Sequence, residues 1–288
     1  MMTGAGVVEI GGEPMDTSLR ESLVKAVVAG LLSWKAEEAL ALSFGCGPRD
    51  IEAAALEAGI RLERYARNFR TIDAEGQLRL HRSRVLIAGC GGLGGHIVEE
   101  LARLGVGSLV LVDPDVFEAS NLNRQILATI ADLGRPKVEA ARARVASINP
   151  AVRVEAYVER LAALNAEALL AGADCAADAL DSIPDRLMLE KACAGHGLPM
   201  VHAAIAGPYV QATTVVPGSG SLRRLYGEGS PPKGIETELG NPAYTPAIAA
   251  SIEVAEIVRI LVGQAPALAG VLLHFDLERM EAVRLAIG

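Results

Sequence analysis

The sequence is poor in aromatic residues, which make up 3% of its 288 residues. Hydrophobic residues nevertheless reach 51% and charged residues 22%, so the core must consist mainly of alanine, valine, leucine and isoleucine. This length suits one large α/β domain with a small appendage. Basic residues are also in deficit, 27 against 35 acidic ones, and the net charge of −8 argues against a general nucleic-acid-binding surface.

Cysteine is scarce as well, with four residues and no C-x-x-C pair, which gives no sign of a zinc-finger or thioredoxin-type site. Unpaired cysteines suit a reducing compartment. The N-terminus lacks the basic and apolar regions of a signal peptide, and no apolar run approaches the roughly 20 residues of a membrane span. We therefore expect a cytoplasmic protein with no membrane partner.

The first part of the chain is predicted to be a helical appendage over residues 1–60, of which about the first 16 are flexible. Two helices are expected over 36–45 and 49–59, in the manner of a helix-turn-helix. The second has one arginine among acidic residues, so a docking or packing role is favoured over DNA binding. The apolar residues expected on one helix face are Leu19, Leu23, Val27 and Leu31.

The second part, residues 61–288, alternates strands with helices. Strands are expected at 85–88, 108–113, 152–157, 174–180, 200–205 and 209–216, helices at about 95–104, 137–148, 184–195 and 245–263, and a hairpin at 272–285. Residues 217–246 hold six glycines and five prolines and are predicted to be a mobile loop. This order predicts an α/β fold: a Rossmann-like, doubly wound, mostly parallel sheet with a later antiparallel portion.

A glycine-rich turn, VLIAGCGGLGG at 85–95, joins the first of these strands to a helix and fits G-x-G-x-x-G through Gly89, Gly91 and Gly94. Glycines let the backbone approach a phosphate, and the helix start offers free N–H groups. Asp113 ends the next strand, where a carboxylate can accept hydrogen bonds from ribose hydroxyls. These residues alone are compatible with NAD, FAD, an S-adenosyl group or ATP.

A dense polar cluster follows Asp113 and favours ATP. Lys137 is expected to begin a helix, where a cation opposes the helix dipole and an anionic ligand would explain it. Converging cations suit attack on the α-phosphate of ATP, where charge builds up, and hydride transfer does not need them. Two alternatives stay open: an NAD-dependent oxidoreductase, which would bind NAD, and a non-catalytic nucleotide-binding regulator, which would release no pyrophosphate.

The joint pattern RVLIAGCGGLGG, LVLVDPD, SNLNRQ and GRPKVEAARARVASINP resembles the ThiF/MoeB/HesA family, which is related to the ubiquitin-activating enzymes. The resemblance covers roughly Arg61 to Leu285, about three quarters of the chain. It implies an adenylyltransferase that uses ATP and Mg²⁺ to activate the C-terminal glycine of a small ubiquitin-like sulfur-carrier protein. Pyrophosphate is released, and the product would serve a sulfur pathway of the thiamine or molybdopterin type.

The same resemblance implies a role for each matching residue. The nucleotide loop would comprise Gly89, Gly91, Gly92 and Gly94, and Asp113 would hold the ribose. The residues that would reach the phosphates are Asn121, Arg124, Gln125 and Lys137. The stretch DALDS at 178–182 matches the family's C-T-D-N-like segment, so Asp181 would serve Mg²⁺, with Ser182 in place of asparagine and Asp178 as the rival carboxylate.

Upstream, ERYARNFR resembles a family segment whose second arginine, here Arg67, reaches the partner subunit's ATP site in relatives. This implies a homodimer; the alternative is an arginine on a helix surface. The chain departs from many relatives in lacking two C-x-x-C pairs, so no zinc is expected. The loop at 217–246 lacks a cysteine to accept the acyl group, and Cys193 is expected to be a small buried residue. Catalysis would then stop at the adenylate, with a separate sulfur donor.

Overall fold

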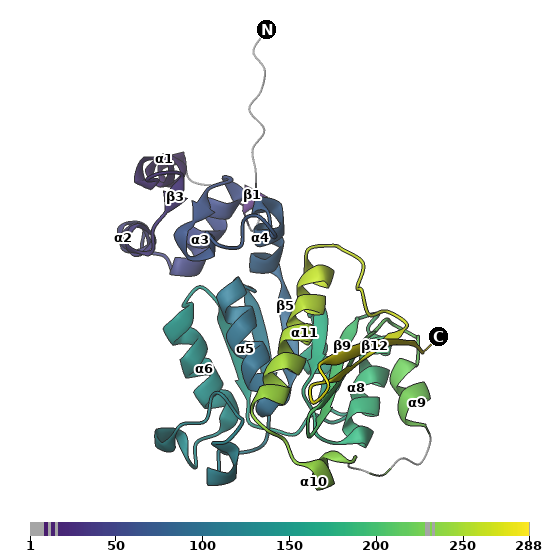
Figure 1. Cartoon of the computed structure of the whole chain (residues 1–288). Coiled ribbons are helices and arrows are strands. Elements are labelled where there is room, and N and C mark those ends of the chain that lie inside the picture. Colours follow the sequence, from purple (N-terminus) through teal and green to yellow (C-terminus); the bar gives the residue numbers. More distant parts are fainter. Residues whose placement is uncertain (1–8, 11–12, 15–16, 228–230, 232–233, 288) are drawn as a thin grey trace. The chain divides into compact units, whose positions relative to one another are not determined.

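The computed structural model describes residues 9–10, 13–14, 17–227, 231 and 234–287 (Figure 1). The chain forms two compact units, Met1–His81 and Arg82–Gly288. The structure thus divides the chain at 81/82, whereas the sequence predicted a boundary at 60/61. The reason is that Leu62 and Tyr65 are buried in the same hydrophobic cluster as Leu23 and Ile51.

The first unit is mainly helical. Its elements are β1 (Glu9–Ile10), β2 (Glu13–Pro14), α1 (Thr17–Ala26), β3 (Leu31–Leu32), α2 (Trp34–Phe44), α3 (Pro48–Glu57), β4 (Arg61–Leu62), the 3-10 turn η1 (Glu63–Tyr65) and α4 (Ala74–Arg82). The helices expected at 36–45 and 49–59 are confirmed as α2 and α3. Much of the predicted flexible start lies outside the described residues.

One expected helix face in this unit is wrong. Helix α1 ends at Ala26, and the chain turns through Ala29 and Gly30, which have φ of 51° and 80°. Leu31 therefore lies in β3, which pairs in parallel with β4, and does not continue the helix. The four-residue spacing of leucines and valine was fortuitous across this turn, because left-handed residues interrupt any helix.

The second unit contains an eight-stranded sheet in the order β12-β11-β10-β9-β8-β5-β6-β7. Strands β7, β6, β5, β8 and β9 are parallel, and β10, β11 and β12 continue from β9 as antiparallel strands. The strands are β5 (Arg84–Ala88), β6 (Ser108–Val112), β7 (Arg153–Tyr157), β8 (Cys175–Asp178), β9 (Met200–Ala206), β10 (Tyr209–Val215), β11 (Val271–Asp276) and β12 (Glu281–Ala286). The predicted fold class is confirmed.

Helices cover both faces of this sheet. The expected helices are confirmed as α5 (Gly92–Leu104), α6 (Lys137–Ile148), α8 (Ile183–Gly195) and α11 (Tyr244–Leu261). Helices α5, α6 and α11 pack together on one face (Figure 1), and α8 packs with α7 (Ala166–Leu170) and α9 (Ser221–Tyr226). Alternate strand residues such as Leu86 and Val110 share a cluster with Leu189 of α8, as the two-residue period of a strand requires.

The segment 217–246, expected to be loop, contains α9 and α10 (Glu236–Leu239). Its glycines mark helix ends: Gly220 and Gly227, with φ of 62° and 75°, flank α9. The intervening SLRRLY has neither glycine nor proline, so the composition of the whole segment concealed a short helix. Among the described residues, no helix combines the length and apolar character that crossing a bilayer needs.

The turn between β5 and α5 can be built only from glycine at two positions. Gly89 has a φ of 97°, and a Cβ there would lie 2.5 Å from the Ala179 carbonyl oxygen. A Cβ on Gly94 would lie 1.9 Å from the Gly89 carbonyl oxygen. Real Cβ atoms do not approach backbone this closely, so the motif is first a packing requirement of β5, α5 and the end of β8.

We expect Gly94→Ala to lower the free energy of unfolding by about 3 kcal/mol or more, because rigid backbone cannot yield to the added methyl group. Gly195→Ala is the matched control: Gly195 also lies in a helix, and a Cβ there meets nothing within 4 Å. That variant should stay within about 1 kcal/mol of the wild type. Urea titration followed by circular dichroism measures both; equal stability of the two variants would contradict this account of the turn.

Candidate active site

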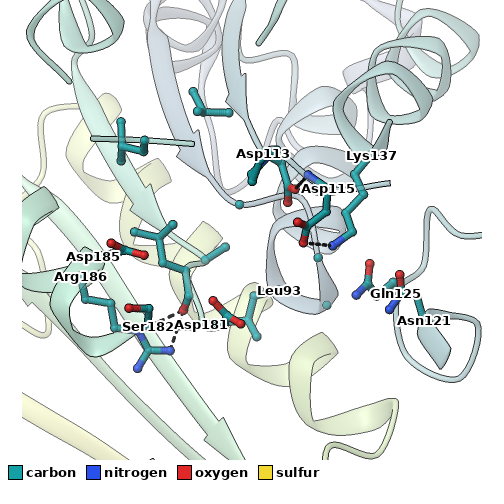
Figure 2. Close-up of a pocket in the computed structure, with 18 of the residues that line it drawn as sticks. Leu93, Asp113, Asp115, Asn121, Gln125, Lys137, Asp181, Ser182, Asp185 and Arg186 are labelled. Atoms are coloured by element: carbon teal, nitrogen blue, oxygen red, sulfur yellow. Dashed lines mark hydrogen bonds and ion pairs between the residues drawn. The ribbon is translucent and has the colours of Figure 1, made fainter. Parts of the chain in front are cut away.

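The carboxyl ends of β5, β6 and β8 meet at one pocket of about 620 Å³. Strand β5 lies between β6 and β8, so the chain leaves β5 in one direction and later returns to its other side. Such a switch point is the usual ligand site of an open α/β sheet, because the loops part there. Figure 2 shows two polar walls, the first formed by Asp113, Asp115, Asn121, Gln125 and Lys137, the second by Asp181, Ser182, Asp185 and Arg186.

The glycine turn forms the floor between these walls, with Gly89, Gly91 and Gly92 lining the pocket. Helix α5 begins at Gly92, and its N-cap residue Gly91 offers no side chain to the free N–H groups of the first turn. These N–H groups and the positive end of the helix dipole favour an anion. Gly94 does not line the pocket, so its role is the packing described above.

Asp113 follows β6 and is 5% exposed. Its Oδ2 accepts a hydrogen bond from the Cys90 amide at 2.7 Å, and its Oδ1 accepts one from the Asp115 amide at 2.8 Å. Burial raises the pKa of this carboxyl, and the Cys90 amide and the charge of Lys137 oppose that rise. The carboxylate is thus fixed at the pocket wall with lone pairs still able to accept hydroxyl donors.

Lys137 is the first residue of α6, as the sequence predicted, and it is 7% exposed. Its Nζ donates to Oδ2 of Asp115 at 2.8 Å. The Asp115 side chain is 63% exposed, so exchanging this partner for an anion costs little. Sequence reasoning missed Asp115, although the spacing of the two aspartates in DPD was a usable signal, since both follow the same buried strand.

Gln125 carries a polar atom that fits a ligand. It is buried, and its Oε1 has no hydrogen-bond partner among the described residues. Asn121 is also buried, but its Oδ1 accepts from the Glu118 amide and so orders its own loop. Arg124 lines the pocket while its Nη1 donates to Ser120 O and Asn123 Oδ1, both at 3.0 Å. The structure brings all three predicted residues to the first wall.

The second wall follows β8. Asp181 and Ser182 line the pocket, and Ser182 is the N-cap residue of α8. Asp178, the rival carboxylate, is fully buried and is absent from the pocket lining. Its oxygens are engaged by His202 and the Leu180 amide, so of these two carboxylates it is Asp181 that lines the pocket.

Arg67 belongs to the first unit, where it is exposed in a turn after η1. The alternative that placed it on a helix surface is therefore wrong. Cys193 is 1% exposed, which confirms that it is buried, and burial raises the pKa of its thiol to about 12. In the part of the chain that the structure describes, no group of three or more His, Cys, Asp or Glu side chains could hold a metal ion.

Comparison with known proteins gives consistent matches. The ThiF family model matches residues 64–287. The chain is 39% identical to the SAMP-activating enzyme E1 of Haloferax volcanii, over 75% of this chain and 82% of that protein. It is 36% identical to the sulfur carrier protein adenylyltransferase of Thermus thermophilus, over 75% and 83%. The crystal structure of E. coli MccB with ATP shares the fold, with a TM-score of 0.65 and 19% identity over 95% of this chain and 88% of that one.

Proposed function

Because the chain belongs to the ThiF family, we propose that it adenylates the C-terminal glycine of a small ubiquitin-like sulfur-carrier protein with ATP and releases pyrophosphate. The observation that carries this proposal is a convergence in one pocket. A bare helix start, the buried Asp113, the buried Lys137 and the carboxylate of Asp181 all line it. This set offers partners to the ribose, the phosphates and the Mg²⁺ of Mg-ATP, whereas hydride transfer would give Lys137 and Asp181 no role.

The donors and acceptors of the pocket match successive parts of ATP, from the ribose to the phosphate chain. Asp113 would accept from the ribose hydroxyls, and the α5 start with Gly89, Gly91 and Gly92 would hold phosphate oxygens. Lys137, Arg124, Asn121 and Gln125 would reach the phosphate chain, where Lys137 exchanges Asp115 for an anion. Gln125 would donate to the phosphates from its Nε2. Its unpartnered Oε1 can only accept, so it supports a ligand that also offers a donor such as a hydroxyl or a bound water, because an unsatisfied buried carbonyl costs about 1–3 kcal/mol.

Mg²⁺ fits the second wall, where Asp181 supplies one carboxylate and phosphate oxygens and water complete an oxygen shell. When bound, the ion offsets negative charge on the phosphates. Ser182 lies beside Asp181 and offers a further hydroxyl. No zinc site is proposed, because the chain has no C-x-x-C pair.

The attacking group needs no general base, because a C-terminal carboxylate is already ionised at neutral pH. One of its oxygens attacks the α-phosphorus, and the bond to pyrophosphate breaks. The protein's part is to position the two anions and to offset charge with Arg124 and Lys137. Consistently, none of the described residues that line the pocket is a histidine.

A second hollow of about 640 Å³ supports a peptide substrate. It shares Asn241 with the ATP pocket, and Pro208, Leu239 and Tyr244 also line it. A Gly-Gly tail has no side chains and fits such a connected space. The relatives' names include both SAMP activation and sulfur-carrier adenylylation, which supports a sulfur-carrier protein as the substrate. A pathway of the thiamine or molybdopterin type is proposed from the family resemblance of the sequence. The four free cysteines fit the cytoplasm.

The proposal includes a homodimer in which Arg67 of one chain completes the ATP site of the other. Large apolar side chains are exposed between β6 and α6, namely Val116, Leu122, Ile126, Ile130 and Leu133. Ile130 is 81% exposed. Exposed apolar side chains concentrated on one segment are typical of protein interfaces, which supports self-association.

ATP–pyrophosphate exchange tests the reaction itself, with a panel of purified carrier proteins that end in Gly-Gly. One carrier should induce exchange, and Asp181→Asn should lower its rate about 100-fold or more. The reason is that Mg²⁺, which would offset the negative charge of the transition state, loses its carboxylate ligand. Asp174→Asn is the control: Asp174 precedes the same strand at the opposite edge of the sheet, where Oδ2 accepts from the Arg84 amide. No exchange despite ATP binding would favour the regulator; binding of NAD in place of ATP would favour the oxidoreductase.

Mixing two inactive variants tests the shared site. Arg67→Ala and Asp181→Asn each disable both sites of their own homodimer. After random exchange of subunits, a mixed dimer keeps one intact site, so about a quarter of the wild-type exchange rate should return. A mixture as inactive as its components, in material that sedimentation shows to be dimeric, would rule out an arginine supplied by the partner.

A further inference from the structure

A chain of buried and partly buried hydrogen bonds lies behind the second wall of the pocket. Arg186 Nη1 lies 2.9 Å from the Tyr226 hydroxyl, which lies 3.0 Å from Nε2 of His202. Nδ1 of His202 lies 2.7 Å from Oδ2 of Asp178. His202 and Asp178 are fully buried, and the Arg186 side chain is 14% exposed. Four elements contribute one residue each: α8, α9, β9 and β8.

The direction of these bonds is fixed by chemistry. A guanidinium can only donate, so the Tyr226 oxygen accepts from Arg186; the Asp178 carboxylate can only accept, so a neutral His202 ring takes the tyrosine proton at Nε2. His202 must then carry its proton on Nδ1 and donate it to Asp178. Burial lowers the pKa of His202, which agrees with a neutral ring at neutral pH. The chain therefore runs one way, from a cation to a carboxylate, through a single histidine tautomer.

Both ends of this chain hold the backbone of Leu180. Arg186 donates to the Leu180 carbonyl oxygen from Nε at 3.0 Å and from Nη2 at 2.7 Å. The Leu180 amide donates to Oδ1 of Asp178 at 3.1 Å. Leu180 directly precedes Asp181, so this chain of hydrogen bonds fixes the backbone from which the Asp181 carboxylate projects. With all three guanidinium nitrogens engaged, Arg186 fixes this wall and is not a spare phosphate-binding cation.

Tyr226 brings α9 into this arrangement. It is the last residue of α9, and the carboxylate of Glu190 on α8 accepts from the Leu222 and Arg223 amides at the start of that helix. The tyrosine hydroxyl links Arg186 to His202 by hydrogen bonds, while a longer contact of 3.9 Å joins Arg186 Nε to Oδ2 of Asp178. Removing it would leave a buried guanidinium N–H and a buried imidazole nitrogen without this partner.

We propose that Tyr226 is a positioning residue for Asp181, acting through Arg186 and His202 on the Leu180 backbone. This rests on the proposed function, in which Asp181 serves Mg²⁺. Residues that orient a metal-binding carboxylate without touching the metal typically change affinity or activity about 10- to 100-fold. The hydroxyl of Tyr226 should therefore affect turnover and the Mg²⁺-dependent part of ATP binding, and not ATP binding as such.

The first test needs no activity. Long-range ¹H–¹⁵N spectra detect the five imidazoles, and the loss of one set of signals in His202→Asn assigns His202. The His202 ring should be neutral and protonated at Nδ1 at neutral pH. Tyr226→Phe should change the His202 nitrogen shifts and leave the other rings unchanged. A His202 ring protonated at Nε2, or charged, in the wild type would overturn the proposed chain.

The second test compares Tyr226→Phe with Tyr209→Phe, which removes a hydroxyl from a half-buried tyrosine on β10 of the same sheet. Tyr226→Phe should lower kcat for exchange about 10- to 100-fold and change KM for ATP by less than about twofold. Tyr209→Phe should keep both constants. Equal losses in the two variants, or a loss confined to KM, would overturn the positioning role.

Calorimetry of ATP binding with and without Mg²⁺ tests the positioning role of Tyr226 separately from the proposed adenylation activity. Tyr226→Phe should reduce the gain in affinity that Mg²⁺ gives the wild type, and leave metal-free ATP binding unchanged. A wild type that exchanges with no carrier refutes the proposed function, while the spectra and this binding difference still decide the role of Tyr226. An unchanged Mg²⁺ gain in Tyr226→Phe refutes the positioning role even if exchange is found.

Discussion

The close approach of three backbone segments is the constraint on which the rest of the site depends. Gly89 and Gly94 let the end of β5, the start of α5 and Ala179 after β8 meet without side chains between them. This contact brings the α5 N–H groups to the residues that follow β8. Without it, the two polar walls would face a wider gap, and one nucleotide could not touch both.

Charges of both signs are arranged around that contact. The described residues that line the pocket include four basic and five acidic ones: Arg124, Lys137, Arg160 and Arg186, and Asp113, Asp115, Asp181, Asp185 and Glu236. Two of the basic side chains are already paired with a carboxylate: Lys137 pairs with Asp115, and Arg160 pairs with Asp185 at 2.7 Å. Binding of a phosphate chain is then an exchange of partners rather than the relief of bare charge.

Much of this could be predicted from the sequence, because local rules determine it. The strands and long helices of the second unit follow from apolar periodicity, and Asp113 and Lys137 follow from their places beside a buried strand and at a helix start. The short helix α9 was missed because glycine and proline were counted over the whole segment 217–246. The six residues of α9, between Gly220 and Gly227, contain neither. The chain of hydrogen bonds from Arg186 to Asp178 could not be predicted from the sequence, because its residues meet only when β8, β9, α8 and α9 assemble.

The central claim is that the pocket joins a carrier's carboxylate to the α-phosphorus of ATP. It is tested most directly with a carrier labelled with ¹⁸O in its C-terminal carboxylate, incubated with enzyme, Mg-ATP and hydroxylamine, which releases AMP from an acyl-adenylate. Attack at the α-phosphorus predicts ¹⁸O in AMP, seen as a shifted ³¹P resonance, with unlabelled pyrophosphate. Label in inorganic phosphate with ADP as the nucleotide product would place the attack at the γ-phosphorus and contradict the account.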